Sequence, residues 1–102
     1  MKRTIFLTPG LVELGDQMEI IHTQIAQKLI EKKIDVVILI QTKGTNFIQK
    51  YFDKYFSNKM KSDFFPTVLT FESAQIAHSQ LKKILKQGDI ILFQNDLTDN
   101  YL

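Results

Sequence analysis

The sequence predicts a small α/β domain in which a mainly parallel four-stranded sheet carries helices on both faces, giving three layers. Two observations lead to this prediction. Four short apolar runs, each bounded by turn or charged residues, alternate with three amphipathic helical patterns, and no repeat, low-complexity tract or linker interrupts the alternation. A β-α-β-α-β-α-β order is typical of a parallel sheet, because parallel strands need a crossover connection. All 102 residues are expected to form a single domain.

The first predicted unit is the strand Thr4–Thr8, which runs into a Pro-Gly turn and then a helix. Asp16 and Glu19 have the spacing of a capping box, so the helix should begin near Gln17. At about 100° per residue, this helix has one apolar stripe and one polar face and should cover one face of the sheet. The apolar stripe contains Met18, Ile21, Ile25, Ala26 and Leu29.

The second unit begins with Val36–Ile40, which is apolar at every position, as expected of a central strand buried on both faces. The polar residues 41–44 should form a loop, and Thr45 or Asn46 should cap the second helix. The aromatic residues of that helix have helical spacing and should mainly enter the core. They are Tyr51, Phe52, Tyr55 and Phe56, and the width of this stripe suggests that Phe52 or Phe56 meets another domain.

The last unit begins at Pro66, which sets the start of a third strand, Thr67–Phe71. Ser73 should cap the third helix, and Gly88 should end it as a left-handed cap residue. The run Ile90–Phe93 then predicts a fourth buried strand.

Right-handed crossovers leave two common strand orders for such a chain, 3-2-1-4 and 2-1-3-4, of which we favour the first. In that order strands 1 and 4 are neighbours, and the loop after Thr8 faces the residues after Phe93 across one crevice. Loops at the carboxyl ends of parallel strands commonly bind ligands, because helix N-termini point there. The loop between Thr8 and Gly15 is therefore the first candidate for a binding site.

Composition and charge argue against several classes of protein. The net charge is only +2, with 13 basic and 11 acidic residues, so a nucleic-acid partner is not expected. There is no cysteine, and the longest apolar run has five residues, far short of the roughly 18 to 20 that a membrane span needs. The first residues make a poor signal peptide. We therefore expect a cytoplasmic protein with no membrane partner.

Familiar cofactor and metal motifs are not satisfied. Gly10 and Gly15 have the spacing of a phosphate-binding P-loop, but Asp16 and Gln17 stand where that loop needs Lys and Ser or Thr. No GxGxxG fingerprint is present, so a nicotinamide cofactor is not expected. Two histidines without a cysteine or an HxxxH spacing also make no metal site.

Two groups of polar residues each allow a structural and a functional interpretation. His22 lies on the apolar stripe of the first helix, which favours a packed histidine bonded to a backbone group over a ligand contact, and His78 should lie at the surface. The second group follows the last strand. Its members either form a solvated tail or bind a ligand, a cation or an adjoining domain beside Thr8 and Glu13. These residues are Asn95, Asp96, Asp99 and Asn100.

Both ends of the chain resemble the C-terminal domain of the Mur ligases. The stretches LTPGLVELG at Leu7–Gly15 and GDIILFQNDLTDNY at Gly88–Tyr101 carry this resemblance. It is closest to UDP-N-acetylmuramoyl-tripeptide:D-alanyl-D-alanine ligase and its Gram-positive relatives. There the first strand ends in Thr-Pro-Gly-Met-Val-Glu-Leu-Gly and the last in Glu-Asn-Asp-Leu-Pro-Asp-Asn-Tyr. Order and spacing agree at both ends, so the resemblance covers essentially the whole chain.

The resemblance implies a Rossmann-like lid and acceptor-binding domain of an ATP-dependent amide ligase of peptidoglycan synthesis. ATP and Mg²⁺ would belong to the central domain of the full enzyme, which joins a UDP-muramoyl peptide to D-Ala-D-Ala or an amino acid. This chain would hold no cofactor, no metal and no catalytic residue of its own. The residues that would line the interdomain cleft are Thr8, Gly10, Glu13, Asn95 and Asp96, with His22 and Asp99 as weaker candidates.

The chain departs from the family pattern at several points. It has Gln94 and Thr98 where the relatives have Glu and Pro, and it has neither a P-loop domain nor a Lys-x-Ser-Arg-Gly segment. It also lacks the Asp-Tyr-Asn segment with which the family's domain opens. The alternative function is a free-standing Rossmann-like module that binds a partner or a small ligand without catalysis.

Overall fold

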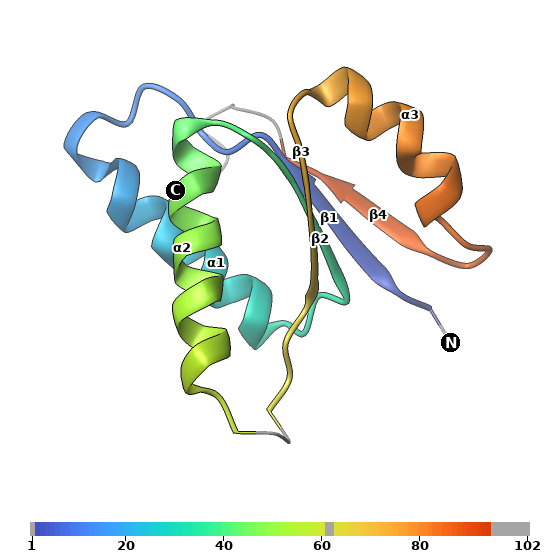
Figure 1. Cartoon of the computed structure of the whole chain (residues 1–102), viewed down its shortest axis with the longest axis horizontal. Coiled ribbons are helices and arrows are strands. Elements are labelled where there is room, and N and C mark those ends of the chain that lie inside the picture. The colour runs from blue at the N-terminus through green and yellow to red at the C-terminus, as the bar shows by residue number, and fades with distance from the viewer. Residues whose placement is uncertain (1, 61–62, 95–102) are drawn as a thin grey trace.

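Four parallel strands form one sheet in the order β3-β2-β1-β4. The structure is a computed structural model that describes residues 2–60 and 63–94 (Figure 1). It confirms the parallel α/β class, the four predicted strand ranges and the favoured strand order. Along the chain the elements are β1 (Thr4–Thr8), a 3-10 turn (Gly15–Gln17), α1 (Met18–Glu31), β2 (Val36–Ile40), α2 (Lys43–Asn58), β3 (Thr67–Phe71), α3 (Ala74–Ile84) and β4 (Ile90–Phe93).

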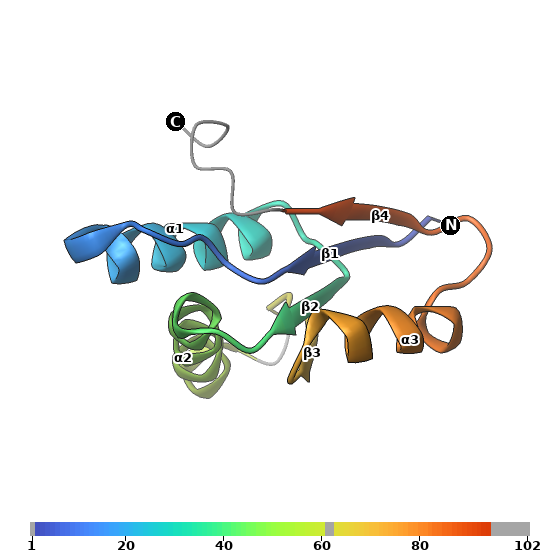
Figure 2. The ribbon, with the colours of Figure 1, turned by 90° about the horizontal axis from the view of Figure 1, so that it is seen from above.

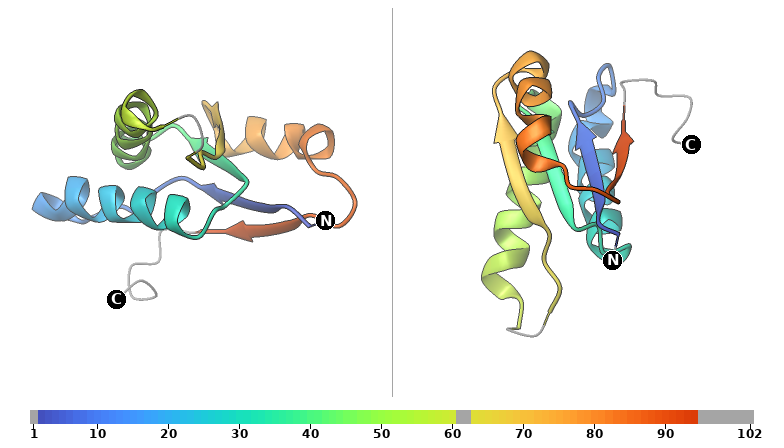
Figure 3. Two further views of the ribbon diagram at one scale, coloured as in Figure 1. Left: turned by 90° about the horizontal axis from the view of Figure 1, so that it is seen from below. Right: turned by 90° about the vertical axis from the view of Figure 1, so that its right-hand side faces the viewer.

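The helices lie on both faces of the sheet. Helices α1 and α2 lie on one side and α3 on the other (Figure 2). This arrangement follows from right-handed crossovers, because the chain moves across the sheet in one direction from β1 to β3 and then returns to place β4 beside β1. The right-hand view of Figure 3 shows α3 in front of the sheet and the other two helices behind it.

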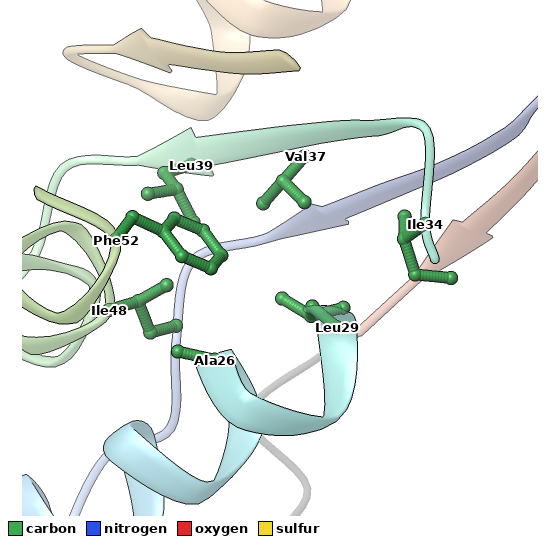
Figure 4. Close-up of a cluster of buried hydrophobic side chains, with 7 residues drawn as sticks. All are labelled: Ala26, Leu29, Ile34, Val37, Leu39, Ile48 and Phe52. Carbon is green, nitrogen blue, oxygen red and sulfur yellow. The ribbon is translucent and has the colours of Figure 1, made fainter. Parts of the chain in front are cut away.

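The core consists of two apolar clusters separated by the sheet. Strand β2 contributes side chains to both clusters, because successive side chains of a strand point to opposite faces of the sheet. On the side of α1 and α2 the cluster contains Ala26, Leu29, Ile34, Val37, Leu39, Ile48 and Phe52 (Figure 4). On the side of α3 it contains Ile5, Leu7, Val36, Ile38, Ile40 and Ala77. The predicted burial of β2 on both faces is therefore confirmed.

Strand β4 is not the buried strand that its apolar sequence predicts. The side chains of Ile90, Leu92 and Phe93 are 44%, 46% and 52% exposed. The reason is position: among the described residues β4 pairs only with β1 and forms an edge of the sheet. Helix α3 packs against β2 and β3, so it leaves the apolar side chains of β4 partly uncovered.

Helix α1 begins within one residue of the predicted Gln17, but the predicted capping box of Asp16 and Glu19 is wrong. Asp16 lies in a 3-10 turn that precedes α1, and neither Leu14 nor Gln17, the residues at the two cap positions, makes a side-chain cap hydrogen bond. Both have helical backbone angles, whereas a capping residue normally has an extended backbone that aims its side chain at the first helical N–H groups. The Asp16 carboxylate is therefore exposed.

The second helix begins three or four residues earlier than expected, with Thr42 as its cap in place of Thr45 or Asn46. Thr42 has an extended backbone, and its Oγ1 accepts a hydrogen bond from Thr45 N at 3.1 Å. Thr45 Oγ1 in turn accepts from Thr42 N at 2.9 Å. The two threonines thus form a reciprocal capping box in which Thr takes the place of the usual Glu or Gln.

The third helix starts as predicted but ends earlier. Ser73 Oγ accepts a hydrogen bond from Ile76 N at 3.2 Å, which confirms Ser73 as the cap. The helix ends at Ile84, before Gly88. Gly88 has the predicted left-handed backbone, with φ of 91°, but it lies in the turn that leads to β4.

An ion pair between Arg3 and Asp89 joins the beginnings of β1 and β4. Arg3 donates from Nη2 to Asp89 Oδ2 at 2.7 Å and from Nε to Oδ1 at 3.1 Å, so the contact is bidentate. Arg3 Nη2 also donates to Ile84 O at 2.9 Å. The hydrogen bonds from Arg3, and then that from Lys86 N, lower the pKa of Asp89 from 3.8 to about 2.

We expect Asp89→Asn to lower the melting temperature at about pH 7 and to lose this effect in acid. A carboxyl whose pKa is depressed in the folded protein stabilises it above the ordinary value of 3.8, and this contribution is lost as the pH falls toward about 2. Thermal unfolding followed by circular dichroism over this range measures it. Glu72→Gln, at an exposed acidic residue, is the matched control. A difference between wild type and Asp89→Asn that stays constant down to the lower value would contradict the assignment.

Candidate functional site

The carboxyl ends of β1 and β4 are joined by one buried hydroxyl group. Thr8 Oγ1 donates to Gln94 Oε1 at 2.7 Å and accepts from Gly10 N at 2.8 Å. Gln94 is itself buried, and its backbone N donates to Leu7 O at 3.0 Å. The residue that ends β1, the loop that follows it and the residue after β4 therefore form one hydrogen-bonded unit.

At Gly10 this loop passes close to α1 and to the beginning of α2. Its φ is +80°, a left-handed conformation that L side chains rarely adopt. A Cβ atom here would lie 3.0 Å from His22 Nε2 and 3.2 Å from Thr45 N. Both the backbone conformation and the close packing therefore favour glycine at this position.

His22 fastens the same loop to α1. Its side chain is fully buried, Nε2 lies 2.9 Å from Leu11 N, and Nδ1 lies 2.7 Å from Met18 O. Because a backbone N–H can only donate and a carbonyl oxygen can only accept, these partners assign the neutral ring with its proton on Nδ1. The interpretation of His22 as a packed histidine bonded to backbone groups is confirmed.

The beginning of α2 supports the loop from a third direction. Thr42 Oγ1 donates to Pro9 O at 2.7 Å, and Thr45 Oγ1 donates to Ile40 O at 2.7 Å. Gly44 lies directly against the imidazole ring, since a Cβ atom at this position would come within 2.3 Å of His22 Nε2. Sequence reasoning missed these residues as parts of the site. The run Thr-Lys-Gly-Thr after a buried strand was the available signal for them.

The candidate residues fall into three groups. The structure brings Thr8, Gly10 and His22 into one buried network. Glu13 lies on the exposed part of the same loop, with φ of 60°, so its carboxylate faces solvent. Asn95, Asp96, Asp99 and Asn100 lie outside the described residues.

A groove of about 420 Å³ opens beside this network, between α1 and β4. Leu11 and Gln94, which belong to the network, form part of its wall. Most of the other lining side chains are apolar, and two lysines and Gln24 are the polar ones apart from Gln94. They are Phe6, Ile21, Gln24, Ile25, Lys28, Leu29, Lys32, Ile34 and Leu92.

The network is built to hold a loop in shape. Thr8 uses its hydroxyl both as donor and as acceptor, and both ring nitrogens of His22 have backbone partners. The other histidine, His78, is exposed, as predicted, and its ring stacks on that of Phe93. Within residues 2–60 and 63–94, no three His, Asp or Glu side chains gather where they could hold a metal ion. In the same part of the chain, no helix has the length and apolar character to cross a membrane.

Comparison of the chain with protein-family models, with curated proteins and with solved structures finds no match.

We expect Gly44→Ala to destabilise the protein although the residue lies in a helix. In an ordinary helix this substitution stabilises by roughly 0.5–1 kcal/mol. Here the added methyl group would overlap the His22 ring, and overpacking of this kind costs about 1–3 kcal/mol. Urea unfolding measures the change in the free energy of unfolding, and Lys43→Ala, at the exposed neighbouring position, is the control. A Gly44→Ala protein more stable than wild type would show that the ring does not need this space.

Proposed function

We propose that this chain is the C-terminal lid and acceptor-binding domain of an ATP-dependent Mur-type amide ligase of peptidoglycan synthesis, which works in the cytoplasm. The contact between Thr8 and Gln94 carries the proposal. It joins the two stretches whose sequences resemble that family, although they lie at opposite ends of the chain. In the proposed enzyme they would form one wall of the cleft between this domain and the ATP-binding domain.

The chemistry of the site suits a lid. Closure over a reactive acyl phosphate has to exclude water, which would otherwise hydrolyse it. That task needs a surface of fixed shape more than it needs a nucleophile. The loop after β1 is fixed because Thr8 and His22 accept hydrogen bonds from its backbone and Thr42 donates one to it. ATP, Mg²⁺ and the UDP-muramoyl peptide would be held by other domains of the enzyme, and D-Ala-D-Ala or an amino acid would be the acceptor.

The apolar edge of the sheet also supports a role beside another domain. Ile90, Leu92 and Phe93 of β4 are about half exposed, and Gln94 follows them directly. Exposed apolar patches commonly mark interaction surfaces. The same observation suits the alternative function, a free-standing module that binds a partner or a small ligand, so activity has to distinguish the two.

The experiment fuses the chain to the UDP-sugar-binding and ATP-binding domains of a tripeptide:D-alanyl-D-alanine ligase. We expect ADP release that depends on both UDP-muramoyl tripeptide and D-Ala-D-Ala, and none from the chain alone. In the fusion, Glu13→Ala should lower turnover about tenfold or more, because cleft residues position the acceptor. Its melting temperature should stay close to that of wild type, since the Glu13 side chain is exposed.

Glu31→Ala is the matched control, an exposed glutamate at the far end of α1. It should leave both turnover and melting temperature unchanged. A fusion no more active than the other two domains alone would overturn the ligase proposal and favour the binding module. Turnover by the isolated chain would contradict the role of a lid.

A further inference from the structure

We propose that His22 is a positioning residue whose neutral ring holds the loop after β1, and that protonation of the ring releases this loop. The proposal rests on the proposed function only for the use of the loop as a cleft wall. The attachment of the loop to α1 depends only on contacts within this chain. His22 is fully buried, and its ring accepts a hydrogen bond from the Leu11 backbone N–H of the loop.

The protonation state of the His22 ring determines whether the backbone N–H of Leu11 has a hydrogen-bond acceptor. Met18 O accepts from Nδ1 at 2.7 Å, so the lone pair that receives the Leu11 N–H at 2.9 Å is on Nε2. Protonation of Nε2 would place one N–H opposite another. Leu11 is buried, so its N–H would then be left without an acceptor in a place that water reaches poorly.

Two glycines keep the ring in its place. Cβ atoms at Gly44 and Gly10 would lie 2.3 Å and 3.0 Å from Nε2. The backbone of α2 and that of the loop are therefore both packed closely against the imidazole ring. The ring has little space in which to turn away from Leu11. The loop can move instead of the ring, because its residues Val12 and Glu13 are exposed.

The charged residues of the surrounding elements do not replace this contact. Helix α1 brings Glu19 one turn before His22, the loop and 3-10 turn bring Glu13 and Asp16, and α2 begins with Lys43. All four are exposed, and none makes a hydrogen bond to the ring. Strands β1 and β2 contain no charged residue. The Leu11 amide therefore reports directly on the protonation of His22.

The test is NMR spectroscopy of the full chain, labelled with ¹⁵N, from neutral pH down to the onset of global unfolding. At the upper end we expect a His22 ring protonated on Nδ1, and a through-hydrogen-bond coupling between Leu11 N and His22 Nε2. Once the ring is protonated, the coupling should vanish and the signal of the Leu11 amide should change with it. Protection of that amide from hydrogen exchange should fall about tenfold or more, while the amides of β2 stay protected.

Two outcomes of this titration would overturn the proposal. In the first, the ring becomes protonated while the Leu11 amide keeps its shift and its protection. In the second, the ring stays neutral until the β2 amides also lose protection, which would make the release part of global unfolding. Neither readout involves ligase activity, so failure here is distinct from failure of the proposed function.

A matched pair of variants separates the two ring nitrogens. In His22→Gln the longer side chain can bring an oxygen to the place of Nε2, whereas in His22→Asn the shorter one reaches only the place of Nδ1. We expect Leu11 to stay protected without pH dependence in the first variant and to lose protection about tenfold or more in the second. His78→Gln, at the exposed histidine, should keep the wild-type titration. Equal Leu11 protection in His22→Gln and His22→Asn would also overturn the proposal.

Discussion

The hydrogen-bonded network at the carboxyl ends of β1 and β4 depends on the parallel pairing of these two strands. This pairing places Leu7 opposite Phe93, and the next residue of each strand end, Thr8 and Gln94, can then share a hydrogen bond. Without it, the first and last strands would end on separate parts of the sheet. A contact over 86 positions of sequence therefore follows from the strand order, and the shape of the loop after β1 follows from that contact.

The loop is held by polar groups that are buried and fully used. Thr8, His22 and Thr45 are buried polar side chains, and among the described residues no buried side-chain nitrogen or oxygen lacks a partner. Because a buried polar group without a partner is costly, such a network favours one arrangement of the loop over its alternatives. The proposed role in closing a cleft would use this fixed shape of the loop.

Long-range burial and local capping were predictable from the sequence to very different degrees. The apolar runs and their spacing predicted all four strands, and the observed strand order is the favoured one of the two that the sequence left open. The capping roles given to Asp16 and to Thr45 or Asn46 were wrong, since a cap depends on backbone angles that residue types alone leave open. The exposure of β4 was missed because an apolar run is the same at the centre and at the edge of a sheet. His22 was predicted as a packed residue, but its partner Leu11 follows from the path of the loop.

The most direct test of the junction between β1 and β4 compares Thr8→Ser with Thr8→Val by amide hydrogen exchange. Serine keeps the hydroxyl group, whereas valine keeps the shape and removes the acceptor of the Gly10 N–H. We predict that the Gly10 amide stays protected in Thr8→Ser and loses protection about tenfold or more in Thr8→Val, while the β2 amides stay protected in both. Equal protection of Gly10 in the two variants would contradict the claim that this hydroxyl holds the loop.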